Sequence, residues 1–263
     1  MNPIVLAPTS LSNSPPLEFI DAAASAGYDG IGLRLFRSPG INYAFYPIAG
    51  DSDLEREVKK ALKESGLKVY DILSFYMQPE TDLDAMAPAL SYGADIGATY
   101  ALVIGDDPDW NRMVDNFGNF CQLAWGYGLT AAIEAPVTQR QVNRLEKAIN
   151  LIKEAGHPNA VVCIDPYHFN NVGDNAEMIR KEDPNLFPYT QIDDGTGGAP
   201  AGRCAPGEGI VPLVDILDAL RPNLPLSLEW GPPRDSGSSA GQWAKIALDK
   251  TRGFLDGYYA SKK

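Results

Sequence analysis

The sequence predicts an α/β fold, a (β/α)8 barrel of the TIM type that forms a single domain over residues 1–263. Two observations favour this fold. Short apolar segments alternate with longer amphipathic segments along the whole chain, which is typical of repeated strand–helix units. Eight segments of each kind can be recognised, and 263 residues is the length that eight such units need. A doubly wound open sheet has similar local patterns and is the alternative.

The predicted strands are short and rich in Val, Ile and Leu. In chain order they lie at 4–7, 30–35, 68–75, 99–104, 129–135, 160–164, 188–192 and 224–230. Longer amphipathic segments follow each strand and predict helices. These lie at 17–26, 53–65, 81–96, 109–124, 139–155, 175–182, 211–221 and 241–258.

Helix-capping residues support two of these helices in particular. Ser52 and Glu55 have the spacing of a capping box at the start of the helix at 53–65. The helix at 139–155 has apolar residues at helical spacing, and Thr138 can cap its first turn.

Composition excludes several classes of protein. The chain has 22 Lys and Arg against 34 Asp and Glu, a formal charge of −12, and its basic residues form no run. We therefore expect no nucleic-acid partner. No signal peptide or membrane span is indicated, so we expect no membrane partner either. The three cysteines, Cys121, Cys163 and Cys204, are far apart and predict free thiols in a reducing cytoplasm. The sequence leaves a homo-oligomer open.

Polar side chains end the last four predicted strands, each after an apolar run. They are Glu134, Asp165, Gln191 and Glu229. Because the carboxyl ends of barrel strands meet at one mouth, we expect these side chains to converge. Three carboxylates placed together repel one another unless a cation lies between them. With the Gln191 oxygen the ligand set consists of oxygen alone, which favours Mg²⁺ or Mn²⁺ over Zn²⁺.

Simpler roles exist for each of these residues. An acidic residue after a strand often only caps the next helix. Gln191 is the weakest member of the set, because its amide can instead fix a neighbouring carboxylate. In that case Asp193 or Asp194 can take its place as a ligand.

Four further residues are candidates for contact with a small polar substrate. His168 can donate to a substrate oxygen or act as a general acid, although it can also be an ordinary loop histidine. Arg203 can clamp a carboxylate, phosphate or enolate with its planar guanidinium, or lie in a surface loop. Arg34, at the end of the second strand, and Glu208 are weaker candidates for substrate contact.

These residues resemble the xylose-isomerase-like TIM barrels, also called sugar phosphate isomerases/epimerases. Members place Glu, Asp, His and Glu on the fifth to eighth strands around one metal ion, with Asp-x-x-His after the sixth strand. The matching residues here are Glu134, Asp165 with His168, Gln191 and Glu229, and the resemblance covers essentially the whole chain. It implies one divalent metal ion, Mn²⁺ or Mg²⁺ first and Co²⁺ or Zn²⁺ next. Gln191 stands where most members have His.

A subgroup of bacterial 3-dehydroshikimate dehydratases is similar in having Gln at that position. It is also similar in the segment Arg-Cys-Ala-Pro-Gly-Glu-Gly at 203–209. Those dehydratases carry an Arg shortly after the third strand, whereas this chain reads Ser-Phe-Tyr-Met-Gln-Pro-Glu at 74–80.

The resemblance implies a metal-dependent isomerase or epimerase of a small keto-sugar or related polyhydroxy ketone. Glu134 and Glu229 are then the acid/base pair that moves a proton next to the carbonyl through a metal-stabilised enediolate. Alternatives are a metal-dependent dehydratase of the 3-dehydroshikimate or keto-inositol type, and a non-catalytic barrel subunit. The related endonuclease IV branch binds three zinc ions through several histidines. This chain has only His157 and His168.

Overall fold

A computed structural model describes residues 1–38, 40, 44–197, 202–232 and 237–262. Eight parallel strands form its main sheet. They are β1 (Ile4–Leu6), β2 (Gly30–Arg34), β3 (Lys68–Met77), β4 (Tyr100–Gly105), β5 (Thr130–Glu134), β6 (Ala160–Val162), β7 (Thr190–Ile192) and β10 (Leu226–Leu228). Their order in the sheet is β6-β5-β4-β3-β2-β1-β10-β7. A parallel bridge between Ile164 and Thr190 joins the two ends of this row. The eight predicted strands and the (β/α)8 barrel are therefore confirmed.

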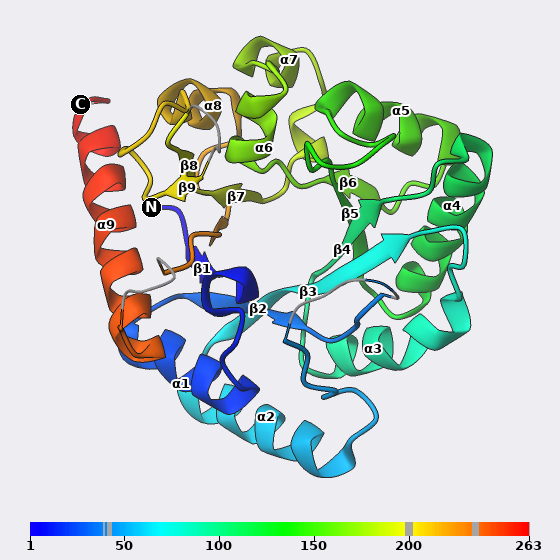
Figure 1. Cartoon of the computed structure of the whole chain (residues 1–263), viewed down its shortest axis with the longest axis horizontal. Coiled ribbons are helices and arrows are strands. Elements are labelled where there is room, and N and C mark those ends of the chain that lie inside the picture. The colour runs from blue at the N-terminus through cyan, green and yellow to red at the C-terminus, as the bar shows by residue number, and fades with distance from the viewer. Residues whose placement is uncertain (39, 41–43, 198–201, 233–236, 263) are drawn as a thin grey trace.

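Helices surround the strands on the outside (Figure 1). They are α1 (Pro16–Ala26), α2 (Ser52–Ser65), α3 (Leu83–Asp95), α4 (Trp110–Gly126), α5 (Leu145–Ala155), α6 (Pro166–Asn171), α7 (Ala176–Arg180), α8 (Leu213–Ala219) and α9 (Ala240–Ala260). The sequence did not predict α6. It also did not predict the short antiparallel hairpin of β8 (Asp194–Gly195) and β9 (Arg203–Cys204), which follows β7.

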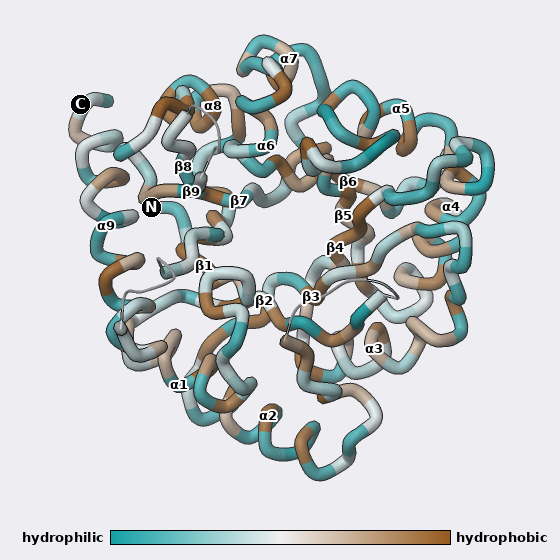
Figure 2. The backbone as a smooth tube through the Cα atoms, viewed as in Figure 1, coloured by the Kyte–Doolittle hydropathy of each residue, from teal (hydrophilic) through white to brown (hydrophobic). Residues whose placement is uncertain are grey.

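The strands are buried on both faces, as expected for a barrel inside a ring of helices. Figure 2 shows hydrophobic residues along the strands and hydrophilic residues on the outer surfaces of the helices. Phe75 of β3 packs on Phe120 of α4, with ring centroids 5.1 Å apart, in the large core between sheet and helices. A smaller, separate cluster fills the barrel interior. Its buried members are Leu73, Leu102, Ala132, Cys163 and Tyr189.

Two predicted helix caps are wrong. The N-cap of α2 is Asp51, not Ser52, because the Asp51 carboxylate accepts hydrogen bonds from the backbone N–H groups of the first turn. The helix predicted from residue 139 begins only at Leu145. The Leu145 N–H donates to Asp174 Oδ2 at 2.8 Å, so a residue beyond the helix, and not Thr138, satisfies its first turn.

Gly32 of β2 lies against the buried carboxylate of Asp71 on β3. A Cβ atom added at Gly32 would lie 2.2 Å from Asp71 Oδ1 and 3.1 Å from Pro8 Cδ. We expect Gly32→Ala to lower the free energy of unfolding by about 2 kcal/mol, because overpacking a tight core costs that much. Gly253→Ala, inside α9 and with open space around it, should instead raise it by about 0.5–1 kcal/mol. Urea unfolding of both variants measures the difference, and equal values would contradict the clash.

In the part of the chain that the structure describes, none of the helices combines the length and apolar character that a membrane crossing requires. Cys121 and Cys163 are buried and Cys204 is half-buried. All three are free, as their spacing predicts.

Candidate active site

The structure brings the four predicted strand-end residues onto four adjacent strands at one end of the barrel. Glu134 is the last residue of β5, Asp165 follows β6, Gln191 lies in β7 and Glu229 follows β10. Glu134, Asp165 and Gln191 are at most 6% exposed, and the Glu229 side chain is 14% exposed. Around the closed barrel, Glu134 and Glu229 are the outer members of this row of four.

The donor atoms of this cluster fit a divalent cation. One ligand atom each from Glu134, Asp165 and His168 lies within 4.8 Å of the other two. The Gln191 amide nitrogen donates to Glu134 Oε2 at 3.4 Å. Its oxygen, Oε1, is buried and has no hydrogen-bond partner among the described residues. A buried oxygen without a donor beside crowded carboxylates is the arrangement that a bound cation would satisfy.

Asp165 is both a member of the cluster and the N-cap of α6. Its Oδ1 accepts a hydrogen bond from the His168 backbone N–H at 2.9 Å, and its Oδ2 accepts one from Arg203 Nη2 at 2.6 Å. The cap fixes the direction of the carboxylate. It also places His168 on the first turn of α6, with Nε2 3.8 Å from Asp165 Oδ2. The Asp-x-x-His spacing is thus the spacing of a helix cap and the turn that it caps.

The Arg203 guanidinium lies in the middle of the cluster. Besides Asp165, its Nη2 is 3.4 Å from Glu229 Oε1 and 3.3 Å from His168 Nε2. Its Nη1 contacts Asp193 Oδ2. The guanidinium also lies over the Tyr167 ring, 4.8 Å from its centroid. Arg203 reaches these partners from β9, in the hairpin that folds back after β7.

Burial and neighbouring charge shift the pKa values of these groups in different directions. Burial raises the pKa of Glu134 well above its usual range, and the charges of Glu229 and Asp165 raise it further. Burial also raises the pKa of Glu229, although Arg203 and Arg34 oppose the increase. For Asp165, burial is outweighed by Arg203 and His168, so its pKa is lowered. Burial lowers the pKa of His168. Two carboxyls with raised pKa values beside an ionised one suit proton transfer.

Asp193 has a role in the cluster that was not predicted from the sequence. This residue is fully buried, contacts Arg203, and its Oδ1 accepts a hydrogen bond from the Tyr167 N–H at 3.2 Å. The sequence suggests it only as a substitute for Gln191. Asp193 lies two residues after Gln191, and residues two apart on a strand share one face. This two-residue spacing is the feature of the sequence that could have placed Asp193 beside Gln191.

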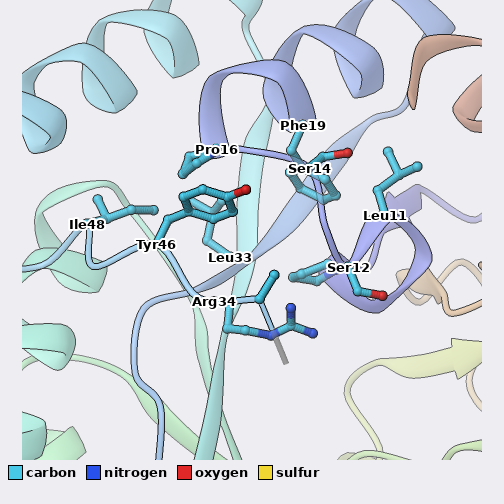
Figure 3. A pocket seen from close by; sticks show the side chains of 11 residues that line it. Leu11, Ser12, Ser14, Pro16, Phe19, Leu33, Arg34, Tyr46 and Ile48 are labelled. Carbon is cyan, nitrogen blue, oxygen red and sulfur yellow. The ribbon is translucent and has the colours of Figure 1, made fainter. Parts of the chain in front are cut away.

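Arg34 and Glu208, the two weaker candidates for substrate contact, lie in different surroundings. Arg34 lines a small cavity of about 40 Å³ beside the barrel mouth, together with Ser12 and Tyr46 (Figure 3). Glu208 does not reach the cluster. Its half-exposed side chain forms an ion pair with Lys250 of α9. The assignment of Glu208 as a substrate contact stays a prediction, and in the structure its carboxylate pairs with the outer helix.

The chain matches one protein-family description, the xylose isomerase-like TIM barrel, over residues 20–252. It belongs to that family. This confirms the resemblance that the motif residues indicate.

Relatives of this xylose isomerase-like barrel include a dehydratase, isomerases and an epimerase. A 3-dehydroshikimate dehydratase of Pseudomonas putida is 25% identical over 256 residues, which cover 85% of this chain and 37% of that protein. An inosose isomerase of Bacillus velezensis is 29% identical over 147 residues, which cover 52% of each. The chain thus spans between about a third and a half of the length of these relatives. A crystal structure of the IOLI protein with bound zinc has a TM-score of 0.80 at 18% identity, covering 98% of this chain and 99% of that one.

In this family member, Asp194 shapes the hairpin and is not directed at the cluster. Its carboxylate accepts hydrogen bonds from the backbone N–H groups of Gly195, Gly207, Gly209 and Val211, at 2.8–3.1 Å. The two oxygens are thereby used within the hairpin and the segment after it. Asp194 is therefore a poor substitute for Gln191 as a metal ligand.

We expect Asp194→Ala to lower the free energy of unfolding by about 3 kcal/mol, because several N–H groups lose a charged acceptor. Asp53→Ala is the matched control, since Asp53 forms an exposed ion pair with Arg56. It should change stability by less than about 0.5 kcal/mol. Urea unfolding measures both, and similar values would show that the Asp194 hydrogen bonds contribute little.

Proposed function

We propose that this chain is a divalent-metal-dependent isomerase or epimerase of a small keto-sugar or related polyhydroxy ketone. The observation that carries the proposal is the row Glu134, Asp165, Gln191 and Glu229. Of its outer members, Glu134 is buried and Glu229 is half-buried, and both carboxyls have raised pKa values. Its inner members offer further oxygen ligands. Isomerase and epimerase names among the relatives support the same class of chemistry.

Glu134, Asp165, Gln191 and Glu229 are the residues proposed to hold the metal, and His168 lies close enough to add a nitrogen. A bound divalent ion polarises the substrate carbonyl and stabilises negative charge that develops on its oxygen. Oxygen ligands favour Mn²⁺ or Mg²⁺, and an additional imidazole ligand would favour Zn²⁺ or Co²⁺.

In the proposed mechanism, one of the two outer carboxylates removes the proton from the carbon next to the carbonyl. If the other glutamate then returns a proton to the opposite face of that carbon, the product is the epimer. If the proton goes to the neighbouring carbon, the product is the isomer. Arg203 Nη2 is placed to donate to a substrate oxygen, and so is His168 when its Nε2, 3.3 Å from Nη2, carries a proton. Burial raises the pKa of both carboxyls, which suits groups that must both accept and donate a proton.

A dehydratase is the second candidate, because the match to 3-dehydroshikimate dehydratase covers 85% of this chain. It begins with the same proton removal. The C–O bond of a β-hydroxyl then breaks, its electron pair leaves with the oxygen, and protonation by His168 releases water. The two candidates share the first step and differ only in the later ones.

The test is a panel of ketoses, keto-inositols and 3-dehydroshikimate, incubated with the protein and Mn²⁺ or Mg²⁺ in D₂O and followed by proton NMR. We expect deuterium to enter the carbon next to the carbonyl of one compound. This exchange should stop after chelation with EDTA and resume when the metal is restored. Product formed without exchange would point to a hydride shift. Absence of both exchange and metal binding would favour the non-catalytic barrel.

A further inference from the structure

Arg203 makes the contacts that a bound cation would make. Its Nη2 donates to Asp165 Oδ2 at 2.6 Å and is 3.4 Å from Glu229 Oε1. Its Nη1 contacts Asp193. These carboxylates follow three different strands, β6, β7 and β10, so one guanidinium joins the ends of neighbouring strands. Carboxylates taken out of water need a positive charge beside them, and Arg203 supplies one.

The oxygens that Arg203 uses overlap with those of the proposed metal site. Asp165 Oδ1 accepts the cap hydrogen bond from the His168 N–H, so Oδ2 is the oxygen directed at the cluster. Arg203 Nη2 is bound to this same oxygen. Glu229, a second proposed ligand, is the other carboxylate beside Nη2. A metal ion that binds these two residues must therefore compete with Nη2.

The two terminal nitrogens of the guanidinium differ in whether their partners are proposed metal ligands. The Nη1 end contacts Asp193, which is fully buried and is not a proposed ligand. The Tyr167 ring lies under the guanidinium, with its centroid 4.8 Å from Cζ. Both contacts can persist when Nη2 leaves Asp165. The Nη1 end of Arg203 is thus anchored by Asp193, whereas the partners of the Nη2 end are also proposed metal ligands.

We propose that Arg203 is the resident cation of this site in the metal-free protein, and that a divalent ion displaces its Nη2 from Asp165 and Glu229. Asp193 retains the Nη1 end. The inference rests on the proposed metal site. It makes metal loading the event that releases the Nη2 hydrogens of Arg203 for a substrate oxygen. Metal therefore binds before substrate.

The experiment measures the Kd of Mn²⁺ for protein stripped of metal, by the EPR signal of free Mn²⁺. It compares the wild type with Arg203→Gln and Arg203→Lys. Because Arg203→Gln removes a charged hydrogen-bonded competitor, we expect it to bind Mn²⁺ at least about tenfold more tightly. Lysine keeps the charge without the planar fork and should give an intermediate Kd. Arg112→Gln is the matched control, since Arg112 forms an ion pair with the buried Asp107 outside the cluster. Its Kd should equal that of the wild type.

Folding of the metal-free variants is checked by thermal unfolding. Arg203→Gln leaves buried carboxylates without their cation, so its melting temperature should fall, and Mn²⁺ should raise it by more than it raises that of the wild type. A second measurement uses the wild type alone. The Arg203 side-chain ¹⁵N signal, assigned by its loss in Arg203→Lys, should shift during a Mg²⁺ titration.

The outcomes separate the inference from the proposed function. Equal or weaker Mn²⁺ binding by Arg203→Gln, or an Arg203 signal that does not respond to Mg²⁺, would overturn the displacement and leave the metal site intact. Binding of Mn²⁺ by the variant but not by the wild type would support displacement in its strongest form. Failure of every variant to bind Mn²⁺ would overturn both proposals.

Discussion

Replacing Glu229 by glutamine is expected to lower turnover by about 10²- to 10⁴-fold while the barrel stays folded. Glutamine has the same shape but can neither accept nor deliver a proton at this position. It also removes a negative charge from a buried cluster that contains Asp165 and Arg203. The measurement is kcat for whichever compound exchanges deuterium, with Mn²⁺ at saturating concentration, and circular dichroism checks the fold.

Glu177→Gln is the matched control for this variant. The same chemical change is made on a glutamate whose exposed side chain pairs with Arg180 of α7, outside the cluster. It should alter kcat by less than about twofold, because exposed ion pairs contribute little. If Glu229→Gln keeps its turnover, Glu229 is not a member of the proton-transfer pair.

Replacing Asp71 by asparagine is expected to stabilise the protein at pH 8. Asp71 lies buried on β3 in the barrel, and burial raises its pKa from 3.8 to about 7, with a smaller contribution from the charge of Glu229. The folded protein therefore holds a proton on Asp71 between about pH 4 and pH 7 that the unfolded chain has lost. The contribution of Asp71 to the free energy of unfolding is therefore largest below its pKa in the unfolded chain. It is lost as the pH rises from there through its pKa in the folded protein. The difference of about three pKa units corresponds to about 4 kcal/mol.

The measurement is the free energy of urea unfolding at pH 4, 5.5, 7 and 8 with EDTA present. The gap between Asp71→Asn and the wild type should widen with pH and level off above about 7. Asp107→Asn is a control of opposite sign. Burial would raise the pKa of Asp107, but its hydrogen bonds with Arg112 lower it. That variant should lose stability at neutral pH and approach the wild type in acid. A gap for Asp71→Asn that does not vary with pH would contradict a raised pKa.

The strands of this barrel could be predicted well because each is a short apolar run followed by an amphipathic segment, and burial on both faces leaves that pattern in the sequence. Helix starts were harder. The first turn of α5 is satisfied by Asp174, which lies 29 residues beyond Leu145. A cap supplied from so far along the chain leaves no local signal near the helix that it begins.

The candidate site also has one part that could be predicted from the sequence and one part that could not. Glu134, Asp165, Gln191 and Glu229 end barrel strands, so topology alone brings them together. The contacts of Arg203 with Asp165, 38 residues away, depend on a hairpin fold-back. The outward direction of Glu208 depends on Lys250 of another helix. Contacts of this kind are set by tertiary packing, which periodicity does not encode.

The double use of the Asp165 carboxylate has a consequence for selection experiments. One of its oxygens caps α6 and the other faces the cluster. Asparagine can cap a helix about as well as aspartate, but it has no negative charge. In a library randomised at position 165, a screen for folded protein should therefore accept Asn together with Asp. A screen for growth on the substrate should recover Asp alone. The two screens would separate what this position contributes to foldability from what it contributes to fitness.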